Sequence, residues 1–144
     1  MSMIRRFSLF DLDRVLEIER QAFPKSPYNW ATFANLQWLY PETFLVYVEK
    51  IPPEEEAKIW GYITFSEDGH IISIAVHPER RRQGIGKTLV GRVITAPRVK
   101  RVWGEVRRNN AGAQAFYRSL GFAVVGMTSN YYGNEDALIM ERLR

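Results

Sequence analysis

The stretch from Ile71 to Thr88, IISIAVHPERRRQGIGKT, sets the organisation of this 144-residue chain. Its opening run, Ile71–Val76, is mostly apolar and rich in β-branched side chains, which predicts a strand. Pro78 ends that strand, because proline cannot donate a hydrogen bond to a neighbouring strand. A helix is predicted from near Ile85, since apolar residues then recur at helical spacing at Leu89, Val90, Val93 and Ile94.

The turn between this strand and this helix combines two glycines, Gly84 and Gly86, with positive charge from Arg80–Arg82 and Lys87. The first turn of a helix leaves backbone N–H groups without partners, and the helix dipole favours an anion there. Glycines let the backbone close on a phosphate, and cationic side chains strengthen the attraction. The turn is therefore a candidate phosphate site.

Three kinds of phosphate-binding loop can be compared with this turn. A Walker A loop needs a glycine where Arg81 stands, and a Rossmann fingerprint needs a third glycine that is missing. The spacing Arg81-x-x-Gly84-x-Gly86 instead resembles the loop with which the GNAT (GCN5-related N-acetyltransferase) family binds the pyrophosphate of coenzyme A. A glycine turn with solvated arginines and no ligand is the simplest alternative.

Composition narrows the class of protein. The length fits one domain, residues 1–144, and 46% hydrophobic with 25% charged residues is typical of a soluble globular chain. The net charge of +4 suits an anionic ligand but is too small and scattered to require nucleic acid. Without cysteine the chain has no disulfide, thiolate metal site or cysteine nucleophile.

The two histidines, His70 and His77, cannot form a zinc site alone, so no metal is expected. Each is interpreted as a strand or turn residue, with a catalytic role as the less favoured alternative. The sequence contains no secretory signal and no apolar run of about twenty residues. We therefore expect a cytoplasmic protein that does not enter a membrane.

Periodicity and turn residues predict an α/β (α+β) fold with a mixed, mostly antiparallel central sheet of about seven strands and about four flanking helices. Ser8 and Asp11 have the spacing of a capping box before the first helix, and Asn29 is a candidate cap for the second. One strand–helix–strand crossover surrounds the glycine turn. The strands are expected at residues 4–7, 44–48, 59–65, 71–76, 99–106, 123–128 and 137–140, and the helices at 12–23, 30–39, from 85, and at 110–120.

Downstream of the turn the sequence continues as Trp103-Gly-Glu-Val-Arg107 with Asn110, and then Ala115-Phe-Tyr-Arg-Ser-Leu-Gly-Phe122. With the glycine turn, this order resembles the GNAT (GCN5-related N-acetyltransferase) family over nearly the whole chain. Several segments resemble one branch, the ribosomal-protein-alanine N-acetyltransferases and related protein N-terminal acetyltransferases. These segments are Ile74–Val76, Glu105–Arg107, Tyr117–Phe122, Asn130–Tyr132 and Glu135–Ala137. Gly104 departs from that branch, which usually has an apolar residue there, and is expected to loosen its strand.

Acetyl transfer to an amine needs a base for the ammonium proton and an acid for the leaving thiolate. Glu105 is the candidate base, because an acid in an otherwise apolar strand needs a reason; an outward-facing glutamate is the alternative. Tyr117 has the spacing of a core aromatic residue. The resemblance instead places its hydroxyl near the thioester sulfur, as the acid.

The resemblance implies acetyl-coenzyme A as the acetyl donor. In the family, a strand edge pairs with the pantetheine arm, the glycine turn holds the pyrophosphate, and an asparagine contacts the arm. Asn110 is also a candidate helix cap. The residues that match these roles are Ile74, Ala75, Val76, Arg81, Arg82, Gln83, Gly84, Ile85, Gly86, Lys87, Asn110 and Tyr117.

Tyr28, Tyr131 and Tyr132 are the candidates for binding the acceptor, because tyrosine offers an apolar wall with a hydroxyl for a peptide carbonyl. Packing at the loop bases is the alternative. The predicted function is acetylation of a protein or peptide N-terminus by a monomer or weak dimer. A GNAT enzyme for a small amine is the second hypothesis. A nucleic-acid module is disfavoured, because the arginines adjoin a glycine turn rather than stacking aromatics.

Overall fold

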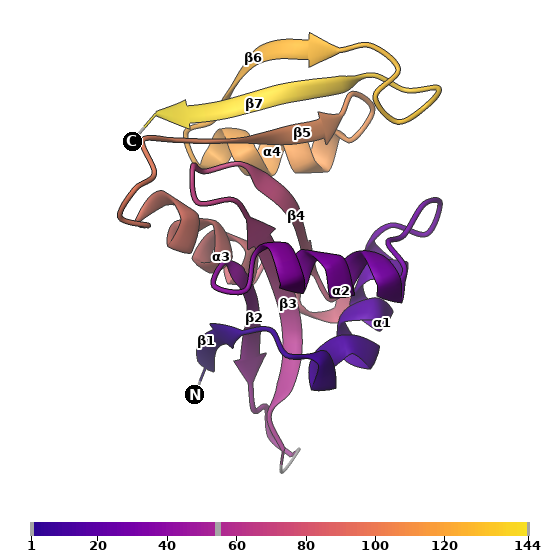
Figure 1. Ribbon diagram of the computed structural model, residues 1–144, viewed down its shortest axis with the longest axis vertical. Coiled ribbons are helices and arrows are strands. Elements are labelled where there is room, and N and C mark those ends of the chain that lie inside the picture. The colour runs from indigo at the N-terminus through magenta and orange to yellow at the C-terminus, as the bar shows by residue number, and fades with distance from the viewer. Residues whose placement is uncertain (1, 54–55, 144) are drawn as a thin grey trace. The chain divides into compact units, whose positions relative to one another are not determined.

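The computed structural model describes residues 2–53 and 56–143 and confirms the α/β class, with four α-helices and seven strands among the described residues (Figure 1). The boundaries predicted for residues 30–39, 71–76 and 123–128 agree with the structure. In chain order the elements are β1 Ser2–Arg6, the 3-10 turn η1 Leu9–Asp11, α1 Leu12–Ala22, α2 Trp30–Leu39, β2 Phe44–Glu49, β3 Lys58–Phe65, β4 Ile71–Val76, the 3-10 turn η2 Pro78–Arg80, α3 Ile85–Ile94, β5 Arg101–Arg107, α4 Ala111–Ser119, β6 Ala123–Thr128 and β7 Ala137–Leu143.

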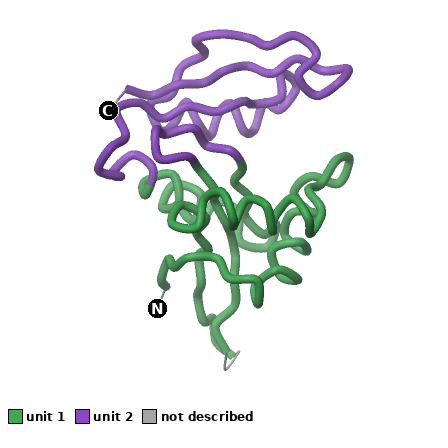
Figure 2. The backbone as a smooth tube through the Cα atoms, viewed as in Figure 1, with its two compact units in different colours: residues 1–65, 73–92 green, residues 66–72, 93–144 purple. Residues whose placement is uncertain are grey.

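The chain forms two compact units (Figure 2). Unit 1 comprises Met1–Phe65 and Ser73–Arg92, and unit 2 comprises Ser66–Ile72 and Val93–Arg144. Consequently, β4 begins in unit 2 and continues in unit 1, whereas α3 begins in unit 1 and ends in unit 2. The seven strands divide into a four-stranded sheet, β1-β2-β3-β4, and a three-stranded sheet, β5-β7-β6.

Strand β3 is the central element of unit 1. Every residue of β3 after Lys58 is buried, so the strand is covered on both faces. On one face Tyr62 packs edge-to-face on Phe33 of α2, with ring centroids 5.4 Å apart, and hydrogen-bonds Glu19 of α1. Helices α1 and α2 therefore lie on the face that carries Tyr62.

Helix α3 packs on the opposite face of β3, which Gly61 carries because successive strand residues point to opposite sides. A Cβ on Gly61 would lie 3.1 Å from Ile85 and 3.2 Å from Leu89, both side chains of α3. The absent side chain thus lets the helix that follows the glycine turn approach the sheet closely.

Both predicted caps in unit 1 are present. The Ser8 side chain accepts from Phe10 N at 3.1 Å, while the Ser8 backbone donates to Asp11 at 2.9 Å. Asn29 Oδ1 accepts from Thr32 N at 3.0 Å and begins α2. These contacts satisfy backbone donors at the start of the 3-10 turn η1, which leads into α1, and at the start of α2.

In unit 2, helix α4 covers one face of the three-stranded sheet (Figure 1). Strand β5 pairs antiparallel with β7 from Arg101 to Arg107, and β6 lies on the other side of β7. Gly121 follows α4 with a φ of 89°, the left-handed conformation predicted for the residue after a helix.

Two expectations about β5 are corrected. The strand begins at Arg101 rather than at Val99, because the Val99 backbone donates to Ala96 at 3.2 Å in a turn after α3. Gly104 does not loosen the strand, since the ladder to β7 continues through it. A Cβ there would lie 3.1 Å from the Ile71 carbonyl oxygen, so glycine permits this close approach.

The predicted crossover is seen where His70 and Trp103 form an isolated parallel bridge, with Trp103 N donating to Gly69 O at 3.0 Å.

The first strand spans residues 2–6 instead of 4–7. In the acidic connector at residues 51–56, Glu54 and Glu55 lie outside the described residues. Among the described residues, no helix is long and apolar enough to cross a membrane.

Candidate functional site

The glycine turn has the backbone conformation that its sequence predicts. Arg82 and Gly84 have φ values of 62° and 85°, both in the left-handed region. Ile85, in contrast, is only 2% exposed and anchors the start of α3 in unit 1. Arg81, Arg82, Gln83, Gly84 and Lys87 are exposed, and Gly86 is half-buried. An exposed backbone loop therefore precedes a helix whose first residue is firmly packed, as an anion site at a helix start requires.

Arg80 has a different role from its two neighbours in the sequence. Its Nε donates to Gln83 Oε1 at 2.7 Å, and its Nη2 donates to Glu49 Oε1 at 2.9 Å. Its guanidinium also lies over the Trp60 ring, 5.0 Å from the centroid. Arg80 thus ties the turn to β2 and β3, and the exposed cations of the turn are Arg81, Arg82 and Lys87.

Ile74, Ala75 and Val76 lie in β4, which is an edge strand of the four-stranded sheet. Ala75 is buried, and its two neighbours are half-buried. An edge strand is what the predicted pairing with pantetheine amides requires, because inner strands use their backbone groups within the sheet.

Glu105 projects from β5 and pairs with His70, whose Nε2 lies 2.9 Å from Oε2 of the carboxylate. The Glu105 side chain is 15% exposed, against 26% for His70. Burial raises the pKa of Glu105, but the hydrogen bond and charge of His70 outweigh it and hold the pKa below its ordinary value. The carboxylate is therefore ionised at neutral pH.

The His70 ring is held in place by Trp103. The two rings stack with centroids 3.9 Å apart and planes 5° apart. Because His70 and Trp103 also form the parallel bridge, both the backbone and the side chain fix the imidazole beside Glu105.

Tyr117 lies on α4 and packs against Phe116 and Phe122, with ring centroids 5.2 and 5.1 Å away. The predicted core position is confirmed, since Tyr117 is buried. Burial, and then Tyr132 and Glu105, raise the pKa of Tyr117 well above its ordinary value. The hydroxyl therefore keeps its proton at neutral pH and is available as a donor.

Asn110 caps α4, as its alternative interpretation predicted. Its Oδ1 accepts from Ala113 N at 2.9 Å. The contact with the pantetheine arm that the resemblance implies stays a prediction.

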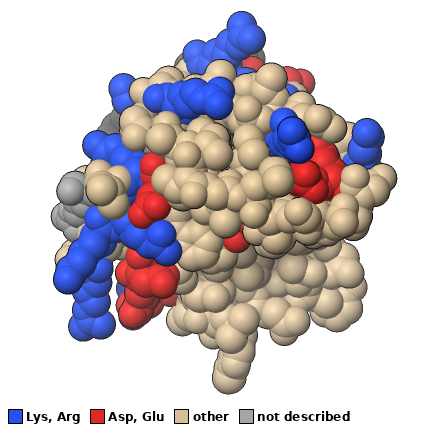
Figure 3. All heavy atoms as spheres, turned by 90° about the horizontal axis from the view of Figure 1, so that it is seen from above, with Lys and Arg blue, Asp and Glu red and all other residues tan. Residues whose placement is uncertain are grey.

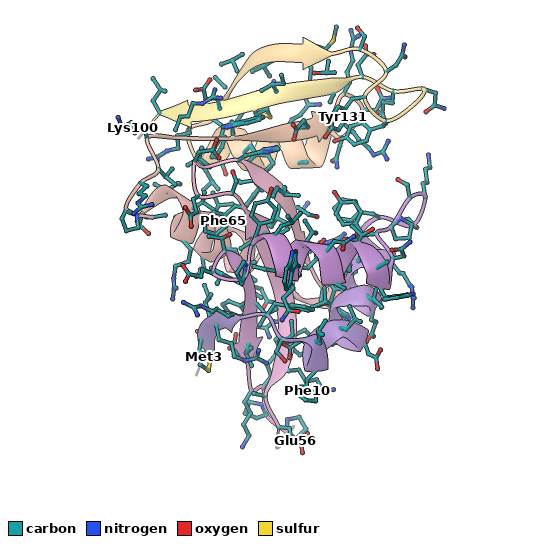
Figure 4. The ribbon with its side chains drawn as sticks, in the orientation of Figure 1. Met3, Phe10, Glu56, Phe65, Lys100 and Tyr131 are labelled. Atoms are coloured by element: carbon teal, nitrogen blue, oxygen red, sulfur yellow. The ribbon has the colours of Figure 1, made fainter. Side chains whose placement is uncertain are left out.

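Tyr131 and Tyr132 lie in the loop between β6 and β7, where Figure 4 labels Tyr131. Tyr131 is 50% exposed, and its ring lies edge-on to Tyr132 at 4.8 Å. The Arg107 guanidinium stacks on Tyr132 at 4.0 Å and pairs with Glu135 at 2.9 Å. The loop thus presents one exposed and one braced tyrosine.

Tyr28 lies in unit 1, in the loop between α1 and α2, and its ring packs edge-on against Phe33 at 5.8 Å. Its backbone N–H donates to Glu19 Oε2 at 2.9 Å. Glu19 is only 2% exposed and also accepts from the Tyr62 hydroxyl. The backbone of Tyr28, a candidate for binding the acceptor substrate, is therefore held by a buried carboxylate.

Sequence reasoning missed His70 and Glu19 as site residues. The sequence favours a strand or turn role for His70, and only the fold brings it to Glu105. Glu19 had a detectable signal, because it shares the buried face of α1 with Val15 and Leu16. His77 is a turn residue as expected, accepting from Glu79 N at 3.2 Å.

Charges of both signs adjoin one another on the face drawn in Figure 3. In unit 2, Arg107 pairs with Glu135 at 2.9 Å and Arg108 pairs with Asp136 at 3.3 Å, so these opposite charges neutralise each other. The part of the chain that the structure describes contains no group of three or more His, Cys, Asp or Glu that could hold a metal ion.

Comparison with known proteins gives consistent matches. The profile of the acetyltransferase (GNAT) family matches residues 12–122. An uncharacterized N-acetyltransferase of Methanocaldococcus jannaschii is 39% identical, with 96% of this chain and 89% of the relative covered. The ribosomal protein bS18-alanine N-acetyltransferase of Escherichia coli K12 is 33% identical, with coverages of 97% and 96%. The crystal structure of Ard1 from Thermoplasma volcanium aligns with a TM-score of 0.83 at 29% identity, covering 99% of this chain and 97% of that one.

Proposed function

The chain belongs to the acetyltransferase (GNAT) family, and from this premise we propose that it transfers the acetyl group of acetyl-coenzyme A to a protein N-terminus. It is an N-acetyltransferase, and the proposed parts are the acetyl donor, the acceptor and the mechanism. The E. coli relative, which acts on an alanine of ribosomal protein bS18, supports that acceptor over nearly the full length of both chains.

The single observation that carries the proposal is the loop of aromatic side chains in unit 2. An exposed Tyr131 beside a Tyr132 braced by Arg107 offers an apolar surface with hydroxyl groups. Such a surface suits the backbone and first side chain of an extended peptide. A small amine has no peptide carbonyls to use these hydroxyls.

The α-amine also suits the chemistry of Glu105. Its reference pKa is about 7.7–8.0, against about 10.4 for lysine, so a larger share is neutral at physiological pH. The lowered pKa of Glu105 makes direct removal of a proton from a free ammonium uphill. The carboxylate therefore takes the proton as the C–N bond forms and the nitrogen becomes more acidic, directly or through a water, and His70 stabilises the charge.

Tyr117 supplies the matching acid. Its raised pKa keeps the hydroxyl protonated, and the thiol of the leaving coenzyme, with a reference pKa of about 8.5, leaves more easily when a proton is donated. The hydroxyl also neutralises charge that develops as the thioester breaks.

For the cofactor, the proposal assigns the pyrophosphate to the backbone and cations of residues 81–87 and the pantetheine arm to the β4 edge. The left-handed φ values at Arg82 and Gly84 support this, because they are typical of a loop that turns its backbone N–H groups toward an anion. The family match includes residues of both units, which supports treating residues 1–144 as one acetyltransferase domain. Cytoplasmic location and the monomer or weak-dimer state stay predictions.

The test is a panel of acceptors with acetyl-coenzyme A. It contains peptides with a free N-terminus and varied first residues, the same peptides with a blocked N-terminus and an internal lysine, and free amino acids and polyamines. We expect acetylation of free N-termini, located by mass spectrometry, and none of the blocked peptides. Acetylation of only the amino acids or polyamines would support the small-amine hypothesis and overturn the proposed acceptor.

A further inference from the structure

Glu19 is a buried acid that the proposed chemistry does not use. Its side chain lies in α1 at 2% exposure, and no cation pairs with it among the described residues. Burial raises the pKa of Glu19, and hydrogen bonds from Tyr28 and Tyr62 only partly offset the effect. A carboxylate buried without a cation destabilises a fold unless its oxygens receive hydrogen bonds. The position therefore calls for an explanation beyond packing.

The two carboxylate oxygens of Glu19 receive donors from different elements. Oε2 accepts from the backbone N–H of Tyr28 at 2.9 Å, and Oε1 accepts from the Tyr62 hydroxyl. The Tyr62 oxygen lies 2.8 Å from Ser73 Oγ in β4, immediately before the strand segment assigned to the pantetheine arm. A hydrogen-bonded line thus runs from the acceptor loop through α1 and β3 to the cofactor strand, all within unit 1.

From this line we infer that Glu19 is a positioning residue that sets the acceptor loop at Tyr28 for the incoming peptide. The inference rests on the proposed function, because it takes Tyr28 as an acceptor contact. The backbone is held on both sides of Tyr28, because Glu19 accepts a hydrogen bond from the Tyr28 N–H, and the next residue, Asn29, caps α2 through Thr32. Pro24 and Pro27 restrict the preceding backbone. The Tyr28 side chain is thereby presented from a backbone with little freedom, which reduces the conformational entropy that is lost when a peptide binds.

The same geometry distinguishes the possible substitutions. Glu19→Leu removes both acceptors at similar volume, and Glu19→Asp keeps the charge on a shorter side chain that cannot reach both donors. Glu19→Gln retains an oxygen for Tyr28 N–H, and its amide can donate to Tyr62, which then donates to Ser73. A positioning role therefore predicts rescue by glutamine, whereas a role of the charge itself predicts failure of glutamine.

A matched control is Asp11, another buried acid of unit 1, at 9% exposure. Asp11 pairs with Arg5 at 2.8 Å and caps the first turn through Ser8, so it stabilises the fold without contacting the acceptor loop. Asp11→Asn should lower the melting temperature and leave the KM for the acceptor unchanged.

The experiment measures KM for a peptide acceptor, KM for acetyl-coenzyme A and kcat in wild type and these variants, with exchange of the Tyr28 amide proton followed by NMR. We expect Glu19→Leu and Glu19→Asp to raise the acceptor KM by roughly tenfold, as for one buried hydrogen bond lost. The KM for acetyl-coenzyme A should stay unchanged, Tyr28 exchange should be faster, and Glu19→Gln should stay within about threefold of wild type.

An unchanged acceptor KM in folded Glu19→Asp overturns the inference, and so does a glutamine variant as impaired as the aspartate variant. If Glu19→Leu does not fold, Glu19→Asp carries the comparison. A wild-type protein that acetylates no peptide N-terminus overturns the proposed function instead, so the two failures are distinguishable.

Discussion

Nε2 of His70 lies 2.9 Å from Oε2 of Glu105, a pairing of residues 35 positions apart in the sequence. Because His70 outweighs the effect of burial on Glu105, its removal should let burial dominate and raise the pKa of the carboxyl. A base acts only when ionised, so the acidic limb of kcat/KM should move to higher pH in His70→Ala.

His70→Gln is the matched control for this shift. Glutamine can still donate a hydrogen bond to Glu105 but carries no charge, so its limb should move less than that of His70→Ala. A pH–rate profile for the two variants that coincides with wild type would show that His70 does not tune the base.

Glu105→Gln tests the base directly. The amide cannot accept a proton, so kcat should fall by roughly 10²–10⁴ with little change in acetyl-coenzyme A affinity. The deficit should stay about constant as pH rises, because wild type and variant both start from the neutral amine and differ only in removing the proton that becomes acidic as the C–N bond forms. Steady-state kinetics across pH, with folding checked by circular dichroism, would remove Glu105 from the mechanism if the neutral-pH rate were unchanged.

Tyr117→Phe should also lower kcat, by less than the loss in Glu105→Gln. A thiol with a pKa of about 8.5 is a tolerable leaving group without a donated proton. Tyr117 is packed against Phe116 and Phe122, and phenylalanine keeps this packing. The Glu105→Gln/Tyr117→Phe double variant should lose less than the two single effects combined, since both groups act on one transition state. Fully additive losses would mean that the two residues act in separate steps.

Gly84→Val should abolish acetyl-coenzyme A binding while the protein stays folded. Gly84 has a φ of 85°, which a β-branched residue resists, although a Cβ there meets no atom within 4 Å. The defect would therefore come from the backbone conformation of the loop and from the side chain standing where a phosphate approaches. Gly86→Val, in the first turn of α3, should weaken binding for the second reason.

Gly133→Val is a control with the same kind of strain. Gly133 has a φ of 88° and equally open space, but it lies in the β6–β7 loop. Isothermal titration calorimetry should show near-normal acetyl-coenzyme A affinity in this variant. Equal affinity losses in Gly84→Val and Gly133→Val would point to general destabilisation and against a cofactor site at the turn.

Asp11 and Glu19, the two buried acids among the described residues of unit 1, should give opposite pH dependences of stability. Asp11 has a lowered pKa, because burial, which raises it, is outweighed by Arg5 and Ser8. Its stabilisation is present above the ordinary value near 3.8 and is lost as pH falls through the folded-state pKa. Asp11→Asn should therefore be less stable than wild type at neutral pH and converge with it in acid.

Glu19 has a raised pKa, so the folded state binds its proton more tightly than the unfolded state. Stability should fall as pH rises from the ordinary value near 4.5 to the raised folded-state pKa. Glu19→Gln removes this loss and should unfold at a higher temperature than wild type at neutral pH, with the difference vanishing in acid. Thermal unfolding from pH 3 to 8 tests both pH dependences. A difference in melting temperature between wild type and Glu19→Gln that does not change with pH would contradict a raised pKa of Glu19 in the folded state.

Local chemistry explains why much of the secondary structure could be predicted. Helix α2 begins at Trp30 because Asn29 caps it, and β4 ends before Pro78 because proline cannot continue the ladder. Both signals act within a few residues, so no distant partner is needed to interpret them. The start of β5 was harder, since Val99 suits a strand but is held in a turn by Ala96.

The candidate site likewise combines features that are local in the sequence with contacts that depend on tertiary packing. The glycine turn, its cations and the family resemblance are contained in contiguous sequence, because an anion site at a helix start is local backbone chemistry. Only the tertiary structure brings His70 to Glu105 and Tyr62 to Glu19, pairs separated by 35 and 43 positions. A side chain's pKa and its role depend on which groups share its buried surroundings, and that is decided when strands and helices pack, not by any residue's neighbours along the chain.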